Sequence, residues 1–265
     1  MGLPLIADED GIRWITLDRP EIRNALYVED LSRITEAVTG IGDGIKAIVL
    51  TGSGERAFSA GMHVDTFASA APEDGRAIIS SVRDCIGAIR LALVPTVAMI
   101  NGYCIGAAFE MALACDLRVA HPDVRFGLPE VGLGIPSVVE AALLHQYVGL
   151  SKAKEIILTG HLYPVSEFAA QGLINRIVEP AQLRAATLDL LSSITACTRE
   201  VISAQKGLFE TWLNHGLQHS IDTSVGVFAD VFRAPATAAA IARYQQARPR
   251  RVARRSAGEP DIHPR

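Results

Sequence analysis

Two glutamates twenty residues apart are the side chains in this sequence best suited to acid–base chemistry. Glu110 lies in INGYCIGAAFEMALACD, residues 100–116, where a strand pattern leads through a glycine-containing loop into a helix pattern. Its neighbours are apolar or small, so its carboxylate must face water, find a partner or be buried with a raised pKa. From this helix alone, an exposed position and a functional one are equally open.

The second carboxyl group, Glu130, lies in FGLPEVGLGIP, residues 126–136, a segment interrupted by three glycines and two prolines. Irregular loops of this kind often hold functional side chains. A helix cap or an ion pair is the structural alternative for Glu130.

Two glycine-containing turns can present backbone N–H groups to a developing negative charge. Gly106 precedes a predicted helix that begins near Ala107, and the first N–H groups of a helix have no partner inside it. A second turn, in FSAGMHVDTF (residues 58–67), follows a predicted buried strand and places an N–H near Met62. Two such donors could form an oxyanion hole.

The elements that must position these residues alternate between strand and helix up to about residue 135. Asp10-Gly11 predicts a hairpin turn between two short strands, and Asn24 is a candidate N-cap for the helix that follows. Continuous apolar segments at 46–52 and 97–100 are typical of strands that are buried on both faces. Helix patterns dominate after residue 137, so the order predicts an α/β core with a C-terminal helical layer.

Composition restricts the class of protein further. The chain has 265 residues, 49% of them hydrophobic, and a formal net charge of −4, which excludes a disordered or disulfide-scaffold protein and argues against nucleic acid as a partner. The four cysteines are widely separated, which predicts reduced thiols and no metal site. Neither a signal peptide nor a membrane span is expected from the sequence, so we predict a cytoplasmic location.

Five ordered blocks between residues 17 and 180 carry a family likeness. They are LDRPEIRNAL, IVLTGSGERAFSAGMHVDTF, VPTVAMINGYCIGAAFEMALACDLRVA, FGLPEVGLGIP and LTGHLYPVSEFAAQGLINRIVEP. In order and spacing they resemble the crotonase superfamily, the enoyl-CoA hydratase/isomerase family. The resemblance implies an α/β crotonase-type spiral of ββα units within 1–195 and a helical trimerisation region within 196–247. The Arg-rich residues 248–265 are expected to form a disordered tail.

The resemblance also implies an activity. It implies an enoyl-CoA hydratase that adds water across the α,β double bond of a 2-enoyl-CoA thioester, with Glu110 and Glu130 as catalytic residues and the N–H groups of Met62 and Ala107 as the oxyanion hole. It implies no metal and no cofactor besides the coenzyme A of the substrate, and a homotrimer or a dimer of trimers. The positions that match substrate- and CoA-binding segments are Arg23, Ala25, Ala60, His63, Val64, Asp65 and Gly106.

The segment after Glu130 departs from the hydratase pattern. Where hydratases of the family typically have a Gly-rich run, this chain has IPSVVEAALLHQYVG, residues 135–149, with Glu140 expected on a helix face. Other crotonase-type reactions therefore stay open as alternatives, namely double-bond isomerisation, thioester hydrolysis, decarboxylation and retro-aldol cleavage. A non-catalytic acyl-CoA-binding protein is a further alternative.

Overall fold

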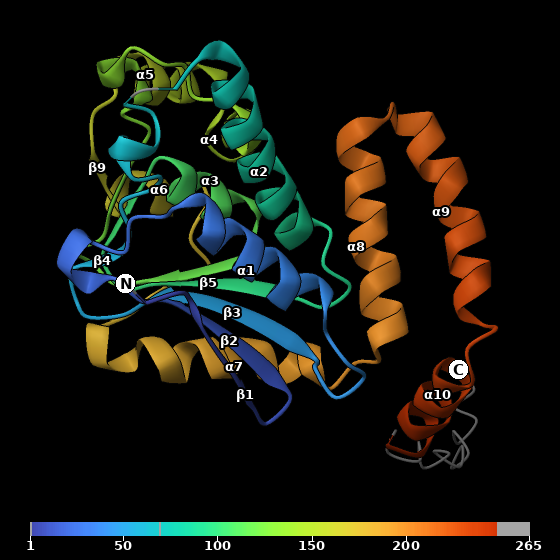
Figure 1. Ribbon diagram of the computed structural model, residues 1–265. Helices are drawn as coiled ribbons and strands as arrows, with labels where there is room; N and C mark the ends of the chain where they lie inside the picture. The colour runs from blue at the N-terminus through green and yellow to red at the C-terminus, as the bar shows by residue number, and fades with distance from the viewer. Residues whose placement is uncertain (1, 69, 248–265) are drawn as a thin grey trace, which may run out of the picture.

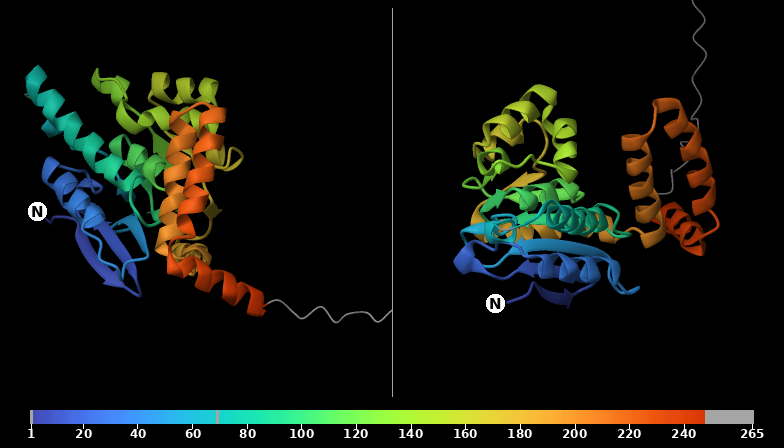
Figure 2. Two further views of the ribbon diagram at one scale, coloured as in Figure 1. Left: turned by 90° about the vertical axis from the view of Figure 1, so that its right-hand side faces the viewer. Right: turned by 45° about the horizontal axis from the view of Figure 1, so that its top comes forward.

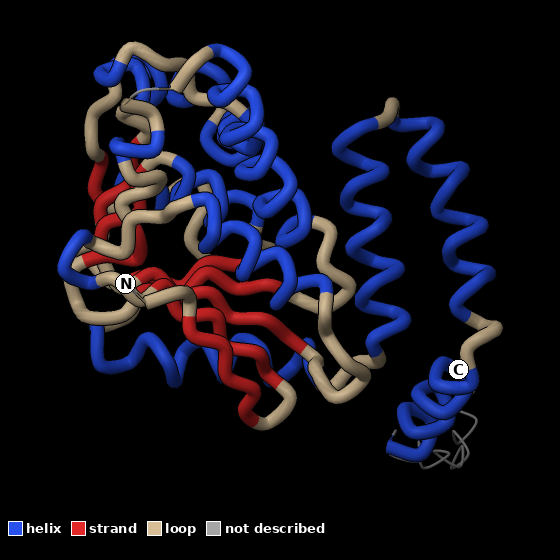
Figure 3. The backbone as a smooth tube through the Cα atoms, in the orientation of Figure 1, coloured by secondary structure: helices blue, strands red, loops and turns tan. Residues whose placement is uncertain are grey.

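The computed structural model describes residues 2–68 and 70–247 (Figures 1 and 3). Within these residues, the main sheet has six strands in the order β1-β2-β3-β5-β7-β10. The strands are β1 (Leu5–Glu9), β2 (Ile12–Leu17), β3 (Ala47–Gly52), β5 (Thr96–Ile100), β7 (Leu117–Ala120) and β10 (Arg176–Ile177). All neighbours are parallel except the antiparallel β1–β2 pair. Every residue of β3 is buried, as its continuous apolar sequence predicts.

The β1–β2 turn confirms the predicted hairpin. Asp10 and Gly11 have φ values of 51° and 78°, and positive φ at both central residues is what a type I′ turn requires. The ladder pairs Glu9 with Ile12 across this two-residue turn.

A second, smaller sheet lies beside the main one, and the chain passes repeatedly from one sheet to the other, which gives a spiral path. Its order is β4-β6-β8-β9, with β4 (Ala57–Ser59), β6 (Tyr103–Ile105) and β8 (Arg125–Gly127) parallel and β9 (Tyr163–Pro164) antiparallel to β8. The chain twice passes from the main sheet to the small sheet and then into a helix, as β3-β4-α2 (Pro72–Arg90) and β5-β6-α3 (Ala107–Ala114). A third pair, β7-β8, leads into the 3-10 turn η3 (Glu130–Leu133). This is the predicted spiral of ββα units.

Helices cover both faces of the main sheet (Figures 1 and 2). On one face lie α1 (Val28–Thr39), α2 and α3, and their buried side chains form the larger core. On the other face, α7 (Leu183–Thr195) packs Leu183 and Leu191 against a smaller core that includes Trp14 and Val97. The remaining short elements are η1 (Pro20–Ile22), η2 (Val64–Thr66), η4 (Val139–Leu143), α4 (Leu144–Val148), α5 (Leu150–Thr159), α6 (Ser166–Ala169) and η5 (Pro180–Gln182).

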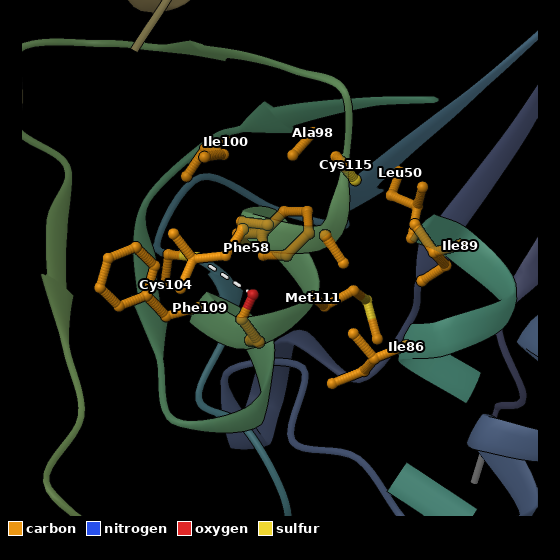
Figure 4. Packing of buried hydrophobic residues seen from close by; sticks show 14 of the residues in the cluster. Leu50, Phe58, Ile86, Ile89, Ala98, Ile100, Cys104, Phe109, Met111 and Cys115 are labelled. Atoms are coloured by element: carbon orange, nitrogen blue, oxygen red, sulfur yellow. Dashed lines mark hydrogen bonds between the residues drawn. The ribbon is translucent and has the colours of Figure 1, made fainter. Parts of the chain in front are cut away.

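Helix α3 is the centre of the larger core. All eight of its residues are buried, because small and apolar side chains surround its whole circumference. Figure 4 shows Phe109 beside Cys104 and Met111 close to Ile86. The Cys104 thiol also donates a hydrogen bond of 3.4 Å to the carbonyl of Ala108. No face of α3 is solvated, so the reading of Glu110 as an exposed residue is wrong.

Three C-terminal helices lie beside this core. They are α8 (Arg199–Asn214), α9 (Leu217–Val231) and α10 (Pro235–Ala247), and α8 packs against α9 (Figure 2). In the described ranges, no single helix is long and apolar enough to cross a membrane, while α9 and residues 235–246 meet that criterion only as a pair bent by 84°. The tail predicted at 248–265 lies outside the described residues, and the domain boundaries stay predictions.

Two local predictions need correction. Asn24 does not cap α1, because the helix begins at Val28 with Tyr27 as its N-cap. Strands also continue past residue 135, since the two-residue strands β9 and β10 extend the small and main sheets. Strands this short are too brief for an alternating or continuous apolar pattern to reveal them.

Candidate active site

Glu110 is buried at the N-terminal end of α3. Glu110 is only 3% exposed. Burial raises the pKa of its carboxyl to about 8, and the negative charges of Glu130 and Glu140 add to the shift. Hydrogen bonding from the backbone of Val138 and Ala141 lowers this pKa in part. A carboxyl group in this state keeps its proton at pH 7 and can release it within the physiological range.

Glu130 reaches the same place from a different element. It is the first residue of η3, and an ideal Cβ built on Gly106 would lie 2.8 Å from its Oε1, so the carboxyl group sits against the backbone just before α3. The hydroxyl of Ser137 donates a hydrogen bond of 2.9 Å to Glu130 Oε2. Burial raises the pKa of Glu130, and the hydrogen bonds from its own backbone N–H and from Ser137 partly offset this. The structure therefore brings the two predicted glutamates together.

The two predicted N–H donors lie on adjoining loops. Gly61 has a φ of 82°, and a Cβ there would lie 2.7 Å from the carbonyl oxygen of Ile105 and 3.2 Å from the nitrogen of Ala107. Only glycine fits this close approach, which brings the segment containing Met62 beside the start of α3. Ala107 is the first residue of α3, so its N–H has no intrahelical acceptor.

The direction of the Met62 N–H follows from a short parallel bridge between Leu26 and Met62. In that bridge Leu26 N–H donates to Gly61 O and His63 N–H donates to Leu26 O, each at 2.8 Å. These bonds use the groups on either side of Met62 and leave its own N–H on the opposite side, away from Leu26. The geometry is compatible with a two-donor site at Met62 and Ala107.

The loop that precedes α1 is fastened to this region by Asn24. Its side chain accepts a hydrogen bond from Arg19 N–H at 2.9 Å and donates to the carbonyls of Ser53 and Ala57 at 3.0 and 2.9 Å. Asn24 is 1% exposed and has a φ of 56°, a conformation that asparagine tolerates better than most residues. Its role is thus to join the segments that contain Arg19, Ser53 and Ala57, rather than to cap a helix.

The residues predicted to contact substrate or CoA lie around this loop junction. Arg23 is exposed, its carbonyl accepts a hydrogen bond of 2.9 Å from Ala60 N–H, and its guanidinium lies 5.7 Å from the centre of the Tyr103 ring. His63 is half-buried and stacks on Tyr27, with ring centres 4.8 Å apart. Val64 and Asp65 are exposed, whereas Ala25 is buried and Gly106 is the N-cap of α3.

Ser137 and the inward position of Glu140 were not predicted from the sequence. Glu140 lies in η4 and is 8% exposed, so it faces the interior. The residue before it, Val139, has a φ of 41°, a strained conformation for a β-branched residue. The apolar pattern of residues 135–149 predicts a helix with Glu140 on its face. It does not signal the 3-10 turn that buries Glu140 instead.

A cavity of about 560 Å³ lies at the opposite end of α3 from Gly106. It is bounded by the C-terminal end of α3, by α4 and by α8, and its walls are largely apolar, with Leu113, Tyr147, Phe209 and Trp212 among the lining residues. Arg90 also lines it, and this arginine connects the cavity wall to Glu140.

The buried state of Glu110 predicts a pH-dependent stability. Because the pKa of this carboxyl is about 8 in the folded protein, above its value in the unfolded chain, its contribution to stability is complete below about pH 4 and is lost as the pH rises through 8. Glu110→Gln resembles the protonated carboxyl in shape and carries no charge at any pH. The difference in free energy of unfolding, variant minus native, should therefore increase by up to about 4 kcal/mol between pH 5 and pH 9.

Urea unfolding of both proteins at several pH values measures this difference. Glu167→Gln, at a position in α6 whose side chain is 46% exposed, is the matched control and should show a much smaller change. A Glu110→Gln difference that is the same at pH 5 and pH 9 would show that Glu110 does not hold its proton in the folded protein.

Known proteins resemble this chain over most of its length. The sequence profile of the Enoyl-CoA hydratase/isomerase family matches residues 7–251. The chain is 29% identical over 231 residues to the short-chain-enoyl-CoA hydratase of Clostridium acetobutylicum, covering 86% of this chain and 87% of that protein. It is 31% identical over 211 residues to the hydroxycinnamoyl-CoA hydratase-lyase of Pseudomonas fluorescens, covering 76% of each. Among solved structures, Pseudomonas aeruginosa DspI superposes with a TM-score of 0.89 at 25% identity, covering 94% of this chain and 95% of that one.

Proposed function

Because the chain belongs to the enoyl-CoA hydratase/isomerase family, we propose that it is an enoyl-CoA hydratase, which adds water across the α,β double bond of a 2-enoyl-CoA thioester. The observation that carries this proposal is the pair of carboxyl groups at the N-terminal end of α3, of which Glu110 is buried and Glu130 is half-buried. Glu130 lies against Gly106, and Glu110 follows one turn further along the helix. Hydration employs two acid–base groups, one for the water and one for the α-carbon.

In the proposed reaction the thioester oxygen accepts hydrogen bonds from the N–H groups of Met62 and Ala107. One carboxylate takes a proton from water while the water oxygen bonds to the β-carbon. The π electrons of the C=C bond move toward the thioester, and negative charge develops on its oxygen, where the two N–H groups and the N-terminus of α3 stabilise it. A carboxyl group then gives a proton to the α-carbon, so the sum is the addition of one water molecule.

The surroundings of the two carboxyl groups support Glu110 as the proton donor and Glu130 as the proton acceptor. The pKa of about 8 keeps a proton on Glu110 at neutral pH; burial also raises the pKa of Glu130, but there the Ser137 hydroxyl stabilises the charged form and partly offsets the rise. Two carboxyl groups whose surroundings give them different proton affinities can act as acid and base at the same pH. The reaction as written needs no metal or redox cofactor.

The CoA part of the substrate is proposed to lie along the loops that surround the two donors. Arg23 offers an exposed cation for a CoA phosphate, and the exposed ring of Tyr103 lies beside it. Ala25, Ala60, His63, Val64 and Asp65 belong to the same two loops, which Asn24 ties together.

The test is the loss of ultraviolet absorbance of crotonyl-CoA and of longer or aryl-substituted enoyl-CoA thioesters, with product mass measured. A product heavier by one water is expected. Conversion to a product of unchanged mass would support the isomerase alternative, which needs a single carboxyl group. Tight binding of the thioesters without turnover would favour the acyl-CoA-binding alternative.

Self-association through the C-terminal helices is a separate proposal. Several large apolar side chains of α8–α10 are exposed, among them Phe209, Trp212, Val225, Phe228 and Phe232. Apolar surface of this extent is typical of a protein–protein interface. We propose a homotrimer or a dimer of trimers, and light scattering on the purified protein should give a mass of three or six chains. A monomer mass would contradict the proposal.

A further inference from the structure

One arginine, Arg90, lies between two carboxylates that belong to different elements. It is the last residue of α2. Its Nη1 donates a hydrogen bond to Glu210 of α8, and its Nε lies 3.5 Å from Oε1 of Glu140 in η4. The exposed fractions of the three side chains are small, 27% for Arg90, 22% for Glu210 and 10% for Glu140. Water therefore screens these charges less than it screens charges on the surface.

The two carboxylates are not held equally. The contact of Arg90 with Glu210 is a charge-assisted hydrogen bond, the stronger kind of ion pair. The contact with Glu140 is an ion pair without a hydrogen bond, and in the described part of the chain neither Arg90 Nε nor Glu140 Oε2 has a hydrogen-bond partner. Arg90 as placed thus satisfies Glu210 and leaves a buried carboxylate incompletely paired, which is costly.

Helix α8 is attached to the rest of the protein by few buried groups. Among its residues, all of which the structure describes, Lys206 alone is buried, and it pairs with Asp116 at 2.5 Å. The cavity of about 560 Å³ lies between α8 and the ends of α3 and α4. A helix with few buried contacts opens at a low free energy. The docking of α8 therefore depends strongly on its ion pairs, and one of these is with Arg90.

The element that carries Glu140 lies against the helix of the candidate site. Segment η4 packs against α3, which carries Glu110, and against α2. Its residue Ala141 belongs to the same core cluster as the apolar side chains of α3. Val139, at the start of η4, has a φ of 41°, and strain of this kind persists only where the surroundings enforce it. A change at Arg90 therefore reaches a strained segment that packs on the helix of Glu110.

We propose that Glu210 of α8 and Glu140 of η4 compete for Arg90, and that this competition couples the docking of α8 to the conformation of η4. While α8 is docked, Arg90 bonds to Glu210, and Glu140 is left without a hydrogen bond. When α8 moves away, Arg90 turns to Glu140 and forms the hydrogen bond that is missing, so η4 is held more firmly. Among the residues that line the cavity, the other cation, Lys206, is already paired with Asp116.

Glu210→Gln tests the competition, because it removes the charge of the α8 carboxylate and nearly keeps its shape. The measurement is hydrogen–deuterium exchange of the substrate-free full-length protein, followed in peptides of α8 and of residues 138–144. Exchange in α8 should become faster by roughly threefold or more, because its ion pair is weakened. Exchange in 138–144 should become slower by a similar factor, because Arg90 is released to Glu140. Unchanged or faster exchange in 138–144 would overturn the proposal.

The double variant Glu140→Gln/Glu210→Gln shows whether Glu140 receives the released arginine. Compared with Glu140→Gln alone, the added Glu210→Gln substitution should no longer slow exchange in 138–144, because the carboxylate that binds Arg90 there is gone. If the slowing persisted in this background, Arg90 would not act through Glu140, and the competition would be rejected.

Two controls separate this effect from a general change in stability. Glu167→Gln, which removes a charge from a surface ion pair with Lys152, should leave exchange in both segments as in the native protein. Peptides of the fully buried strand β3 report global opening and should exchange at the native rate in every variant. All rates are measured without substrate, so the result stands whether or not the protein hydrates crotonyl-CoA.

Discussion

Glu130→Gln is expected to lower kcat for the hydration of crotonyl-CoA by about 10³-fold or more, because an amide can neither accept nor deliver a proton in this pH range. The glutamine has nearly the same volume, and its side-chain oxygen can still accept the hydrogen bond from Ser137. The fold and the binding of CoA thioesters should therefore be retained. The measurement is kcat and KM by the absorbance assay, with the circular dichroism spectrum and melting temperature recorded for each protein.

The control for this variant is Glu167→Gln, a substitution of the same kind at a largely exposed position in α6. It should change neither kcat nor KM. Near-native turnover in Glu130→Gln would show that Glu130 takes no part in proton transfer. An equal loss in the control would point to a general effect of the substitution.

Gly61→Ala is expected to lower kcat by about 10²- to 10³-fold, the loss typical when one oxyanion donor is removed. The added Cβ would lie 2.7 Å from the carbonyl oxygen of Ile105 and 3.2 Å from the nitrogen of Ala107, and both are backbone atoms that a side-chain rotation cannot move. The segment that carries Met62 must then shift away from the start of α3. The two N–H groups would no longer converge on one oxygen atom.

Backbone strain alone could also lower activity, so the control must carry the same strain. Gly172 has a φ of 76°, close to the 82° of Gly61, and a Cβ at Gly172 would meet nothing within 4 Å. Gly172→Ala should therefore lose stability to a similar extent, by roughly 1–2 kcal/mol, and keep its kcat. If Gly61→Ala also kept its kcat, the pairing of Met62 and Ala107 as donors would be refuted.

Several elements were predictable because their signals are local. The Asp10-Gly11 turn and the fully buried strand at 47–52 each follow from the conformational or burial preferences of a few consecutive residues. The resemblance of the two segments around Glu110 and Glu130 to family motifs identified the pair without any structure. The family follows from the order of five blocks, which depends on sequence alone.

Other features depend on what packs against a residue, and sequence periodicity does not report that. Glu110 was equally compatible with an exposed face until the whole circumference of α3 proved to be covered. Asn24 looked like a helix cap, but its side chain bonds groups that are 5 to 33 residues away in the chain.

The sequence by itself determined the family, the α/β spiral and the identity of the two central carboxyl groups, because motif order and apolar patterning are properties of the chain. The tertiary structure decided the states of those groups. Burial within the larger core, together with the negative charges of Glu130 and Glu140, raises the pKa of Glu110 to about 8. Proton affinity depends on the dielectric surroundings and on nearby charges, and folding brings those together from segments far apart in the sequence.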